Sequence, residues 1–449
     1  MKRKVSPVIV SLTIAAAMLA GCGVGTAEVI PVEKITSEPV QVEAEAEAPV
    51  EEPATVVEEV PVGVATTMAE APEETQVEEV AAAPAETPME AVAETPEETP
   101  VEAVAETPEE PSDLPEGMMY SYLTGEPVEE SYGQLRPFAV MINNLAPAVP
   151  QSSIVNADLL YEAYVESSIT RLMAVYQDPS PYDKIGPIRS SRHYYLDFSD
   201  DNDAIYTHFG WSFVAEDRIN NEGRNTINGM FYDGSWGFYR TDDRVAPHNA
   251  YATGQGLIEI AESLGEPRNH AADYQPNLKF NREDTTPEGE DATVIELPYE
   301  VNYPWFEYNA DDKLYYRFEY GEPHVDMETG QQLAFKNVLV QFVAQDFYLD
   351  DPILQDLAVV GTGDGYYFSD GKVIPITWEK TDYGQATKYY TLDGQQLMMN
   401  PGKTMFQIAP PAMNVTWSAD ATASEGYGDQ GEAYVEDTPF DAPEEVAAE

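Results

Sequence analysis

Short apolar runs separated by turn-forming residues predict a strand-rich body in the central part of the chain. Residues 138–145, 158–165 and 169–176 are largely apolar runs of the length typical of strands in a partly buried sheet. Residues 253–265 instead space their apolar side chains as a short helix that ends at Gly265. This mixture favours an α+β or α/β fold for the first half of the body, residues 118–285.

The second half, residues 292–417, is predicted to be a β-rich domain. Asp-Gly and Asn-Pro pairs, which are typical of turns, separate its apolar runs. The glycine-rich stretch 361–365, GTGDG, is interpreted as a hairpin turn more readily than as a phosphate-binding loop. The acidic, proline-containing segment 282–291 is the expected boundary. The predicted strands lie within residues 313–321, 336–345, 364–380, 386–399 and 403–410.

The first 22 residues have the pattern of a secretory signal, with three basic residues, an apolar stretch and small residues at the end. The stretch is short for a membrane span and is interrupted by Ser11 and Thr13. Its final LAGC resembles a bacterial lipobox, which makes Cys22 the expected lipidation site and the lipid the expected membrane contact. An ordinary cleavage site with an incidental cysteine is the alternative. Because Cys22 is the only cysteine, a disulfide within one molecule and a cysteine nucleophile further along the chain are excluded.

Two acidic segments flank the body and are predicted to be disordered. Residues 23–117 consist mainly of Glu, Pro, Ala, Val and Thr, contain no aromatic residue and include a near repeat of period twelve. This composition cannot form a core, so we expect a flexible tether; residues 418–449 form a similar acidic tail. Removing the 26 acidic residues of the tether and the ten of the tail from the total of 81 leaves 45 in the body, against 19 basic residues. The formal charge of about −26 argues against nucleic acid as a partner.

Basic residues are nevertheless concentrated in two stretches of this acidic body. One is IGPIRSSRHYY at residues 185–195, and the other is RTDDRVAPHN at residues 240–249. Guanidinium groups bind phosphate and carboxylate with two parallel hydrogen bonds, so these stretches predict an anion-binding site if they converge. Pairing of the arginines with nearby carboxylates is the alternative. A helix beginning near Ser190 would place Arg189 and Arg192 on one side. The candidate anion-binding residues are Arg189, Arg192, His193, Arg240, Arg244, His248 and Asn249.

Three further residues are candidates for acid–base chemistry. Glu162 and Glu166 are four apart in a predicted strand, which would place both carboxylates on one face, where they would act as an acid–base pair or bind Arg171. His208 lies in an alternating, strand-like run, where a histidine is more often a hydrogen-bonded structural residue than a catalyst. His270 and His324 have no partners at zinc-ligand spacing, so we expect no metal and no cofactor.

Most of the body resembles a known family. The sequences IGPIRSSRHYYLDF, DAIYTHFGWS and RTDDRVAPHNAYAT are similar to the N-terminal domain of the DUF3048 family of YerB-like lipoproteins of Gram-positive bacteria. The sequences VGTGDGYYFSDGKVIPITWEK and LDGQQLMMNPGKTMFQIAP are similar to its C-terminal domain. The resemblance implies lipid attachment at the extracytoplasmic face of the membrane and a two-domain body, and it supplies no reaction.

Two classes of function fit these observations. The first is a binding or scaffold lipoprotein that recognises an anionic cell-wall or envelope component through an arginine-, histidine- and tyrosine-lined site. The second is an envelope hydrolase or transferase acting on a phosphate-linked or glycan substrate, with arginines holding charge and a histidine moving protons. The position of the arginine and histidine side chains decides between them.

Overall fold

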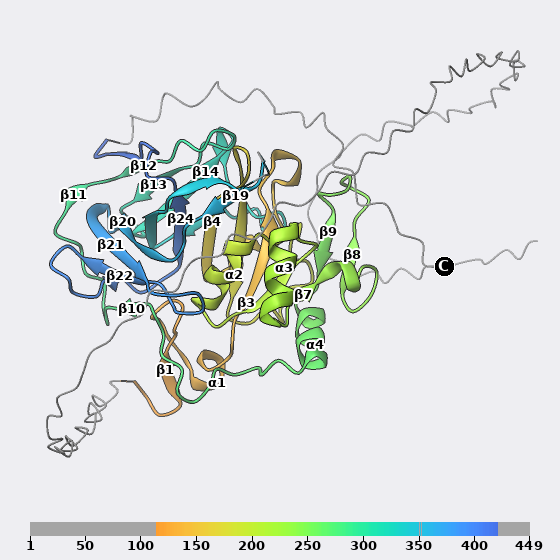
Figure 1. Cartoon of the computed structure of the whole chain (residues 1–449). Helices are drawn as coiled ribbons and strands as arrows, with labels where there is room; N and C mark the ends of the chain where they lie inside the picture. The colour runs from red at the N-terminus through yellow and green to blue at the C-terminus, as the bar shows by residue number, and fades with distance from the viewer. Residues whose placement is uncertain (1–113, 350, 352, 421–449) are drawn as a thin grey trace, which may run out of the picture. The chain divides into compact units, whose positions relative to one another are not determined.

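The computed structural model describes residues 114–349, 351 and 353–420. The expected signal segment 1–22, the lipidation site Cys22, the tether up to residue 113 and the tail from residue 421 lie outside the described residues. Figure 1 shows the described body in colour.

One mixed, 11-stranded sheet forms the centre of the body (Figure 1). From one edge to the other its strands are β11 (Glu290–Asp291), β21 (Lys372–Lys380), β20 (Gly361–Ser369), β17 (Asn337–Phe342), β24 (Thr404–Ala409), β4 (Leu159–Glu166), β5 (Ile169–Tyr176), β3 (Phe138–Asn143), β6 (Ile205–His208) and β7 (Ile227–Asn228), with β22 (Lys388–Thr391) also beside β21. The runs predicted at 138–145, 158–165 and 169–176 are therefore strands.

The two halves of the chain meet in the middle of this sheet. β24 lies between β17 and β4 and pairs in parallel with both, so Thr404 is opposite Asn337 on one side and Leu159 on the other. The large sheet therefore contains strands from both sides of the predicted boundary, residues 282–291. Strands β3, β4 and β5 are buried along nearly their whole length, as expected of strands covered on both faces.

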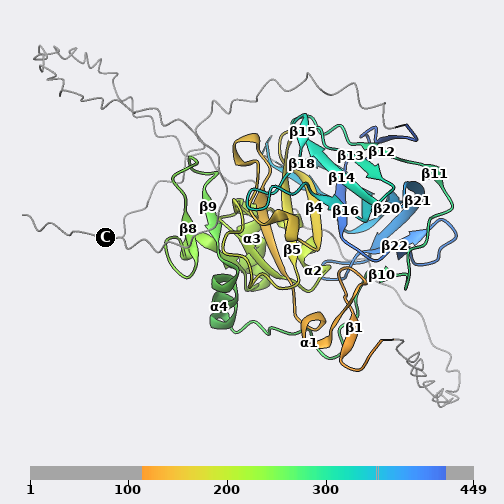
Figure 2. The same cartoon turned by 180° about the vertical axis from the view of Figure 1, so that it is seen from behind.

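A second sheet covers one face of the first (Figure 2). Its strands are β15 (Glu322–Pro323), β14 (Leu314–Glu319), β13 (Trp305–Asn309), β12 (Val294–Glu296) and β25 (Thr416–Ser418), with β16 (Ala334–Phe335) beside β14. Ile295, Phe306 and Tyr315 of this sheet share one hydrophobic core with Val338 and Phe368 of the large sheet. The second half of the body is strand-rich, as predicted.

Among the described residues all four α-helices precede residue 265: α1 (Glu130–Gly133), α2 (His193–Asp200), α3 (Phe213–Glu222) and α4 (Gly254–Leu264). The helix α4 confirms the prediction for residues 253–265. The Thr253 hydroxyl accepts a hydrogen bond from the Gly256 N–H at 3.1 Å, and Gly265 ends the helix with a φ of 77°. Helices α2 and α3 contribute to the core on the opposite face of the large sheet from α4.

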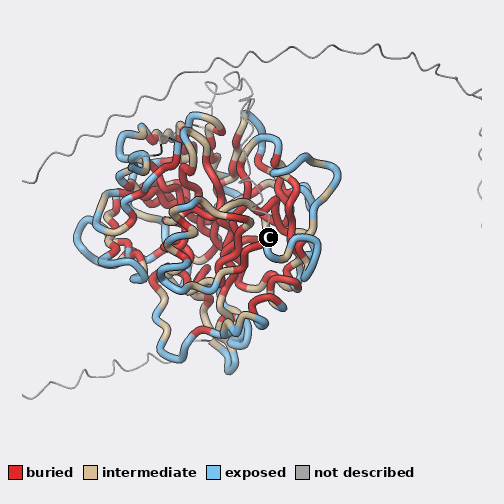
Figure 3. The backbone as a smooth tube through the Cα atoms, turned by 45° about the vertical axis from the view of Figure 1, so that its right-hand side comes forward, coloured by how far each residue is buried: buried red, intermediate tan, exposed pale blue. Residues whose placement is uncertain are grey.

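Four two-stranded ribbons complete the body: β1 (Met118–Tyr120) with β2 (Pro127–Glu129), β8 (Phe238–Arg240) with β9 (Ala250–Ala252), β10 (Lys279–Phe280) with β23 (Met398–Met399), and β18 (Gln345–Phe347) with β19 (Gln355–Leu357). Buried segments occupy the middle of the body and exposed loops surround them (Figure 3). Within the described ranges, no helix combines the length and apolar character that crossing a membrane requires.

The interpretation of residues 361–365 as a hairpin turn is wrong. These residues form the first half of β20 and pair with β21, from Gly361 opposite Lys380 to Gly365 opposite Ile376. The turn lies further along the chain, at Asp370 and Gly371, both of which have positive φ.

Candidate functional site

The first part of the basic stretch, residues 185–189, runs antiparallel beside the end of β3. The Asn143 N–H donates to the Pro187 carbonyl at 2.9 Å, and the Arg189 N–H donates to the Met141 carbonyl at 3.0 Å. Gly186 has a φ of 140°, and a Cβ there would lie 3.0 Å from the Ala250 carbonyl oxygen, so glycine is required for this close approach. The expected helix start near Ser190 is wrong, because α2 begins at His193.

Arg192 is a structural residue and is not part of an exposed anion site. Its guanidinium group forms an ion pair with Glu166, and its side chain is only 7% exposed. The Arg171 Nη2 donates to the same carboxylate at 3.3 Å, so Glu166 lies between two buried arginines. The two arginines of this stretch therefore differ in position: Arg189 is partly exposed, and Arg192 is buried against Glu166.

Three other candidates also bind partners within the protein. The His193 Nε2 lies 2.8 Å from an Asp356 carboxylate oxygen. The Arg240 Nε donates to Asp233 at 2.8 Å, and its Nη1 donates to the Asn249 side-chain oxygen at 3.1 Å. Arg240 therefore follows the ion-pair alternative, and the side chain of Asn249 also holds it, whereas His193 contacts a carboxylate of the protein.

Arg189, Arg244 and His248 lie together beside the end of β3. The Arg189 Nη1 donates to the carbonyl of Pro247, the residue before His248, at 3.4 Å. The His248 Nδ1 is 2.8 Å from the Asn143 Nδ2. The Asn143 side-chain oxygen accepts a hydrogen bond from the Leu145 N–H at 3.0 Å, which identifies the atom facing His248 as the amide nitrogen. The His248 Nδ1 is therefore an acceptor, and its proton is on Nε2.

The two arginines give this trio of residues a positive charge. Burial, and after it the charges of Arg189 and Arg244, lower the pKa of His248 to about 4. Arg244 donates to neutral acceptors, namely the Ala148 carbonyl at 2.6 Å, the Pro150 carbonyl at 2.7 Å and the Tyr251 hydroxyl at 3.1 Å.

One exposed carboxylate, Asp243, lies near this group, and its pKa is lowered by a hydrogen bond from the Thr241 side chain and by the charges of Lys184 and Arg244. At neutral pH the trio thus presents two guanidinium groups and one neutral imidazole N–H, with a carboxylate at its margin.

His208 is a hydrogen-bonded core residue. Its Nδ1 donates to the Gly210 carbonyl at 2.7 Å, so its Nε2 accepts from the Thr226 hydroxyl at 2.9 Å. Its exposed fraction is 0%, and burial lowers its pKa to about 4. Both ring nitrogens have hydrogen-bond partners within the protein, so His208 is a structural residue.

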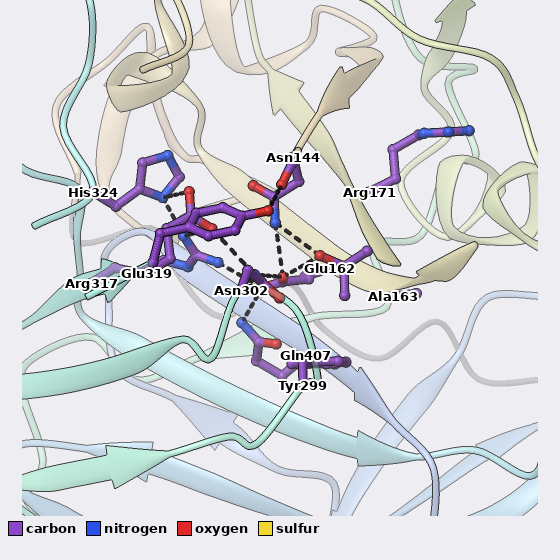
Figure 4. A network of polar contacts seen from close by, with 12 residues as sticks. Asn144, Glu162, Ala163, Arg171, Tyr299, Asn302, Arg317, Glu319, His324 and Gln407 are labelled. Atoms are coloured by element: carbon purple, nitrogen blue, oxygen red, sulfur yellow. Dashed lines mark hydrogen bonds and ion pairs between the residues drawn. The ribbon is translucent and has the colours of Figure 1, made fainter. Parts of the chain in front are cut away.

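Glu162 lies at the centre of a buried polar network between the two halves (Figure 4). One carboxylate oxygen accepts from Asn144 at 3.0 Å, Thr170 at 2.8 Å and Asn302 at 2.7 Å. The other accepts from Arg317 at 2.8 Å and from Gln407 at 3.0 Å. These five hydrogen bonds occupy both carboxylate oxygens and link strands β4, β14 and β24.

The expectation that Glu162 and Glu166 share one face of their strand is wrong. The register of β4 against β5 shifts between Tyr164 and Glu166, and this bulge moves Glu166 to the face that carries Arg171. In Figure 4 the Arg171 side chain points away from the residues around Glu162. The two carboxylates therefore bind different arginines and do not form an acid–base pair.

The network continues from Arg317 to His324. An Arg317 Nη1–H donates to the His324 Nδ1, and the His324 Nε2 donates to the Gln151 side-chain oxygen at 2.7 Å. Burial and the charge of Arg317 lower the pKa of His324 well below its ordinary value. His324 is therefore neutral, and its Nδ1 contact with Glu319 at 3.2 Å is not an ion pair.

Gln151 connects the buried network with the trio at the surface. Its amide nitrogen donates to the Asn143 carbonyl at 2.9 Å, and the Asn143 side chain holds His248. Asn143, Gln151 and Arg317 were not predicted as site residues, because the partners that define their roles are distant in sequence. Among the described residues, no group of three or more His, Cys, Asp and Glu side chains is placed to hold a metal ion.

Comparisons with known proteins place the chain in a family. Residues 123–266 match the family model described as "Protein of unknown function (DUF3048) N-terminal domain", and residues 295–406 match that of the DUF3048 C-terminal domain. The chain belongs to the DUF3048 family, which confirms the resemblance seen in the sequence. The two matched segments contribute β4 and β14, whose side chains meet at Glu162 and Arg317.

Two comparisons with Bacillus subtilis proteins agree with this assignment. The chain is 33% identical over 293 residues to the protein named "Putative lipoprotein YerB" of Bacillus subtilis (strain 168), covering 64% of this chain and 85% of that protein. The crystal structure of YerB from Bacillus subtilis superposes with a TM-score of 0.60 at 30% identity, covering 66% of this chain and 99% of that chain.

Proposed function

We propose that this protein is a lipid-anchored extracytoplasmic binding protein that holds an anionic component of the bacterial cell envelope between Arg189, Arg244 and His248. The ligand group is a phosphate or a carboxylate. The lipid attachment rests on the similarity of residues 19–22 to a lipobox and on the name of the Bacillus subtilis relative.

The observation that carries the binding proposal is that His248 lies near two guanidinium groups, with Arg189 donating to the Pro247 carbonyl. Its Nε2–H is fixed as a donor by Asn143, and the charges of Arg189 and Arg244 both act on its ring. Three N–H-bearing groups beside one another suit an oxyanion, which accepts several charge-assisted hydrogen bonds at once.

The same contacts favour binding over catalysis. Each of the acid–base candidates Glu162, Glu166 and His208 is held by partners within the protein. A general base requires a free lone pair within reach of a substrate proton. The geometry therefore supports recognition of an anion rather than an envelope hydrolase or transferase.

Titration of the full chain with inorganic phosphate at constant ionic strength tests this function. We expect saturable heat in isothermal titration calorimetry and a loss of roughly tenfold or more in affinity for Arg189→Gln, because a charge-assisted hydrogen bond contributes about 1.5–3 kcal/mol. Arg240→Gln is the matched control, since it removes the same charge from a guanidinium group already paired with Asp233. Equal weakening in both variants would reduce the effect to net charge and contradict the proposal.

A further inference from the structure

A cleft in the second half of the body has the features of a second binding site. Its volume is about 740 Å³, and strands β20 and β21 form one wall. Segments 342–344, 358–360 and 411–415, together with Leu392, contribute the rest of the lining. Most of these side chains are apolar or aromatic, including Phe342, Tyr366 and Met413. Leu392 is 68% exposed.

A strand edge lies along this cleft. The pairing of β17 with β20 ends at Gln341 opposite Gly365, whereas β21 continues to pair with β20 as far as Gly361. Over residues 361–364 the strand thus has a hydrogen-bonded neighbour on one side only, as far as the described residues show. In a strand, alternate residues direct their N–H and C=O groups to opposite sides, so part of this backbone faces away from β21.

Glycine at position 363 makes room for a neighbouring side chain that lines the cleft. Gly363 lies over the buried Trp378, whose indole N–H donates to the Phe342 carbonyl at 2.9 Å. A Cβ at Gly363 would lie 2.6 Å from the Trp378 Nε1, so a side chain there would displace the ring or the strand. Gly363 therefore accommodates Trp378 and the Phe342 carbonyl, and Trp378 lines the cleft beside this strand edge.

The charge of the cleft favours a cation. Asp364 is the one charged residue among those that line it, and it is exposed. The body around it carries a formal charge of about −26. An approaching chain with a lysine or arginine side chain would meet attraction both from the body and from Asp364.

We propose that this cleft binds an extended polypeptide segment, which adds as a strand beside residues 361–364, places apolar side chains against Phe342 and Tyr366 and directs a basic side chain to Asp364. Main-chain hydrogen bonds to an open strand edge give affinity, and alternate side-chain positions give specificity, as in other cases of strand addition. The occupant is thus a partner protein with an extended, apolar and basic segment.

Fluorescence anisotropy with a labelled, end-blocked octapeptide of alternating valine and lysine, added to the full chain, tests this proposal. We expect saturable binding and a loss of at least about tenfold when alternate peptide nitrogens are N-methylated, because methylation removes the donors that a strand edge requires. Asp364→Asn should weaken binding by about threefold to fivefold. Asp217→Asn, on the exposed surface of α3, is the matched control and should leave the affinity unchanged.

Three outcomes would overturn the proposal. The first is the absence of saturable binding of the octapeptide. The second is equal affinity for the N-methylated peptide, which would show that side chains alone are recognised. The third is displacement of the peptide by unlabelled protein at concentrations where sedimentation shows self-association, which would assign the cleft to a second copy of the chain.

Discussion

Glu162 and Arg317 form an ion pair at 2.8 Å in which both side chains are fully buried, although the residues are 155 positions apart. Glu162 belongs to β4 and Arg317 to β14, so the pair joins the two segments that match the N- and C-terminal family domains. Burial alone would lower the pKa of Arg317, but the carboxylates of Glu319 and Glu162 raise it above its ordinary value. The charged pair therefore links the two halves of the body in its interior.

Glu162→Gln should destabilise the protein by up to about 3–5 kcal/mol, because it leaves the buried charge of Arg317 with Glu319 as its one remaining carboxylate partner. Urea denaturation followed by tryptophan fluorescence measures the free energy of unfolding. Asp291→Asn, which breaks the exposed pair with Lys372, is the surface control and should cost about 1 kcal/mol or less.

The double variant Glu162→Gln, Arg317→Met tests whether the two side chains act as a pair. We expect it to be less destabilised than the sum of the single variants, since it leaves one buried carboxylate, Glu319, without Arg317, whereas Arg317→Met alone leaves two. Strict additivity would show that each residue stabilises the fold through its other contacts alone.

Glu166→Gln should lower stability without lowering the affinity for phosphate. Its carboxylate neutralises Arg192 and Arg171 in the interior, so we expect a cost of about 3 kcal/mol. Arg189→Gln should weaken phosphate binding, and it should lower the free energy of unfolding by less than Glu166→Gln does. A loss of phosphate binding in Glu166→Gln, at temperatures where the variant is folded, would return Arg192 to the binding site.

The lowered pKa of His208 predicts that the free energy of unfolding decreases in acid. Its pKa is about 4 in the folded protein and about 6.5 in an unfolded chain, so between these values the unfolded state binds a proton that the folded state excludes. Its contribution is complete above pH 6.5 and declines by about 3 kcal/mol as the pH falls to 4.

Substitution of this histidine isolates the effect. In His208→Gln the proton uptake on unfolding at pH 5, obtained from the slope of the unfolding free energy against pH, should decrease by about one proton. An unchanged slope would mean that His208 is protonated in the folded protein.

Protonation of His248 at low pH should strengthen anion binding, because it adds a positive charge to the site. Sulfate keeps its charge between pH 8 and pH 4, so a change in its affinity reports on the protein. Because the pKa of His248 is about 4, we expect nearly constant affinity near neutrality and an increase as the pH approaches 4.5. In His248→Asn the affinity should stay flat over this range, and a rise of the same size in that variant would exclude His248 as its source.

Local sequence patterns predicted the elements of this fold better than their assembly. The apolar runs at 158–165 and 169–176, the apolar spacing of residues 253–265 and the terminal Gly265 act locally, so they indicated strands and a helix at the observed places. The pairing of β24 with β4 involves strands more than 200 residues apart, and no local pattern encodes it.

The candidate site shows the same division. Arg189, Arg244 and His248 were recognised by residue type, but Asn143, which orients His248, was missed because its partner lies 105 positions away. The positions of Glu162 and Glu166 were predicted from strict alternation, which the bulge at Tyr164 and Glu166 breaks. Arg192 has the same residue type as Arg189, and only the tertiary position of Glu166 decides that it is internal.

The most direct test of the anion site is a crystal structure of the protein with bound selenate, using anomalous scattering from selenium to locate the ion. We expect an anomalous peak within hydrogen-bonding distance of the guanidinium groups of Arg189 and Arg244 and of the His248 Nε2, and no such peak in Arg189→Gln. Selenate bound elsewhere on the described body, with this position vacant, would contradict it.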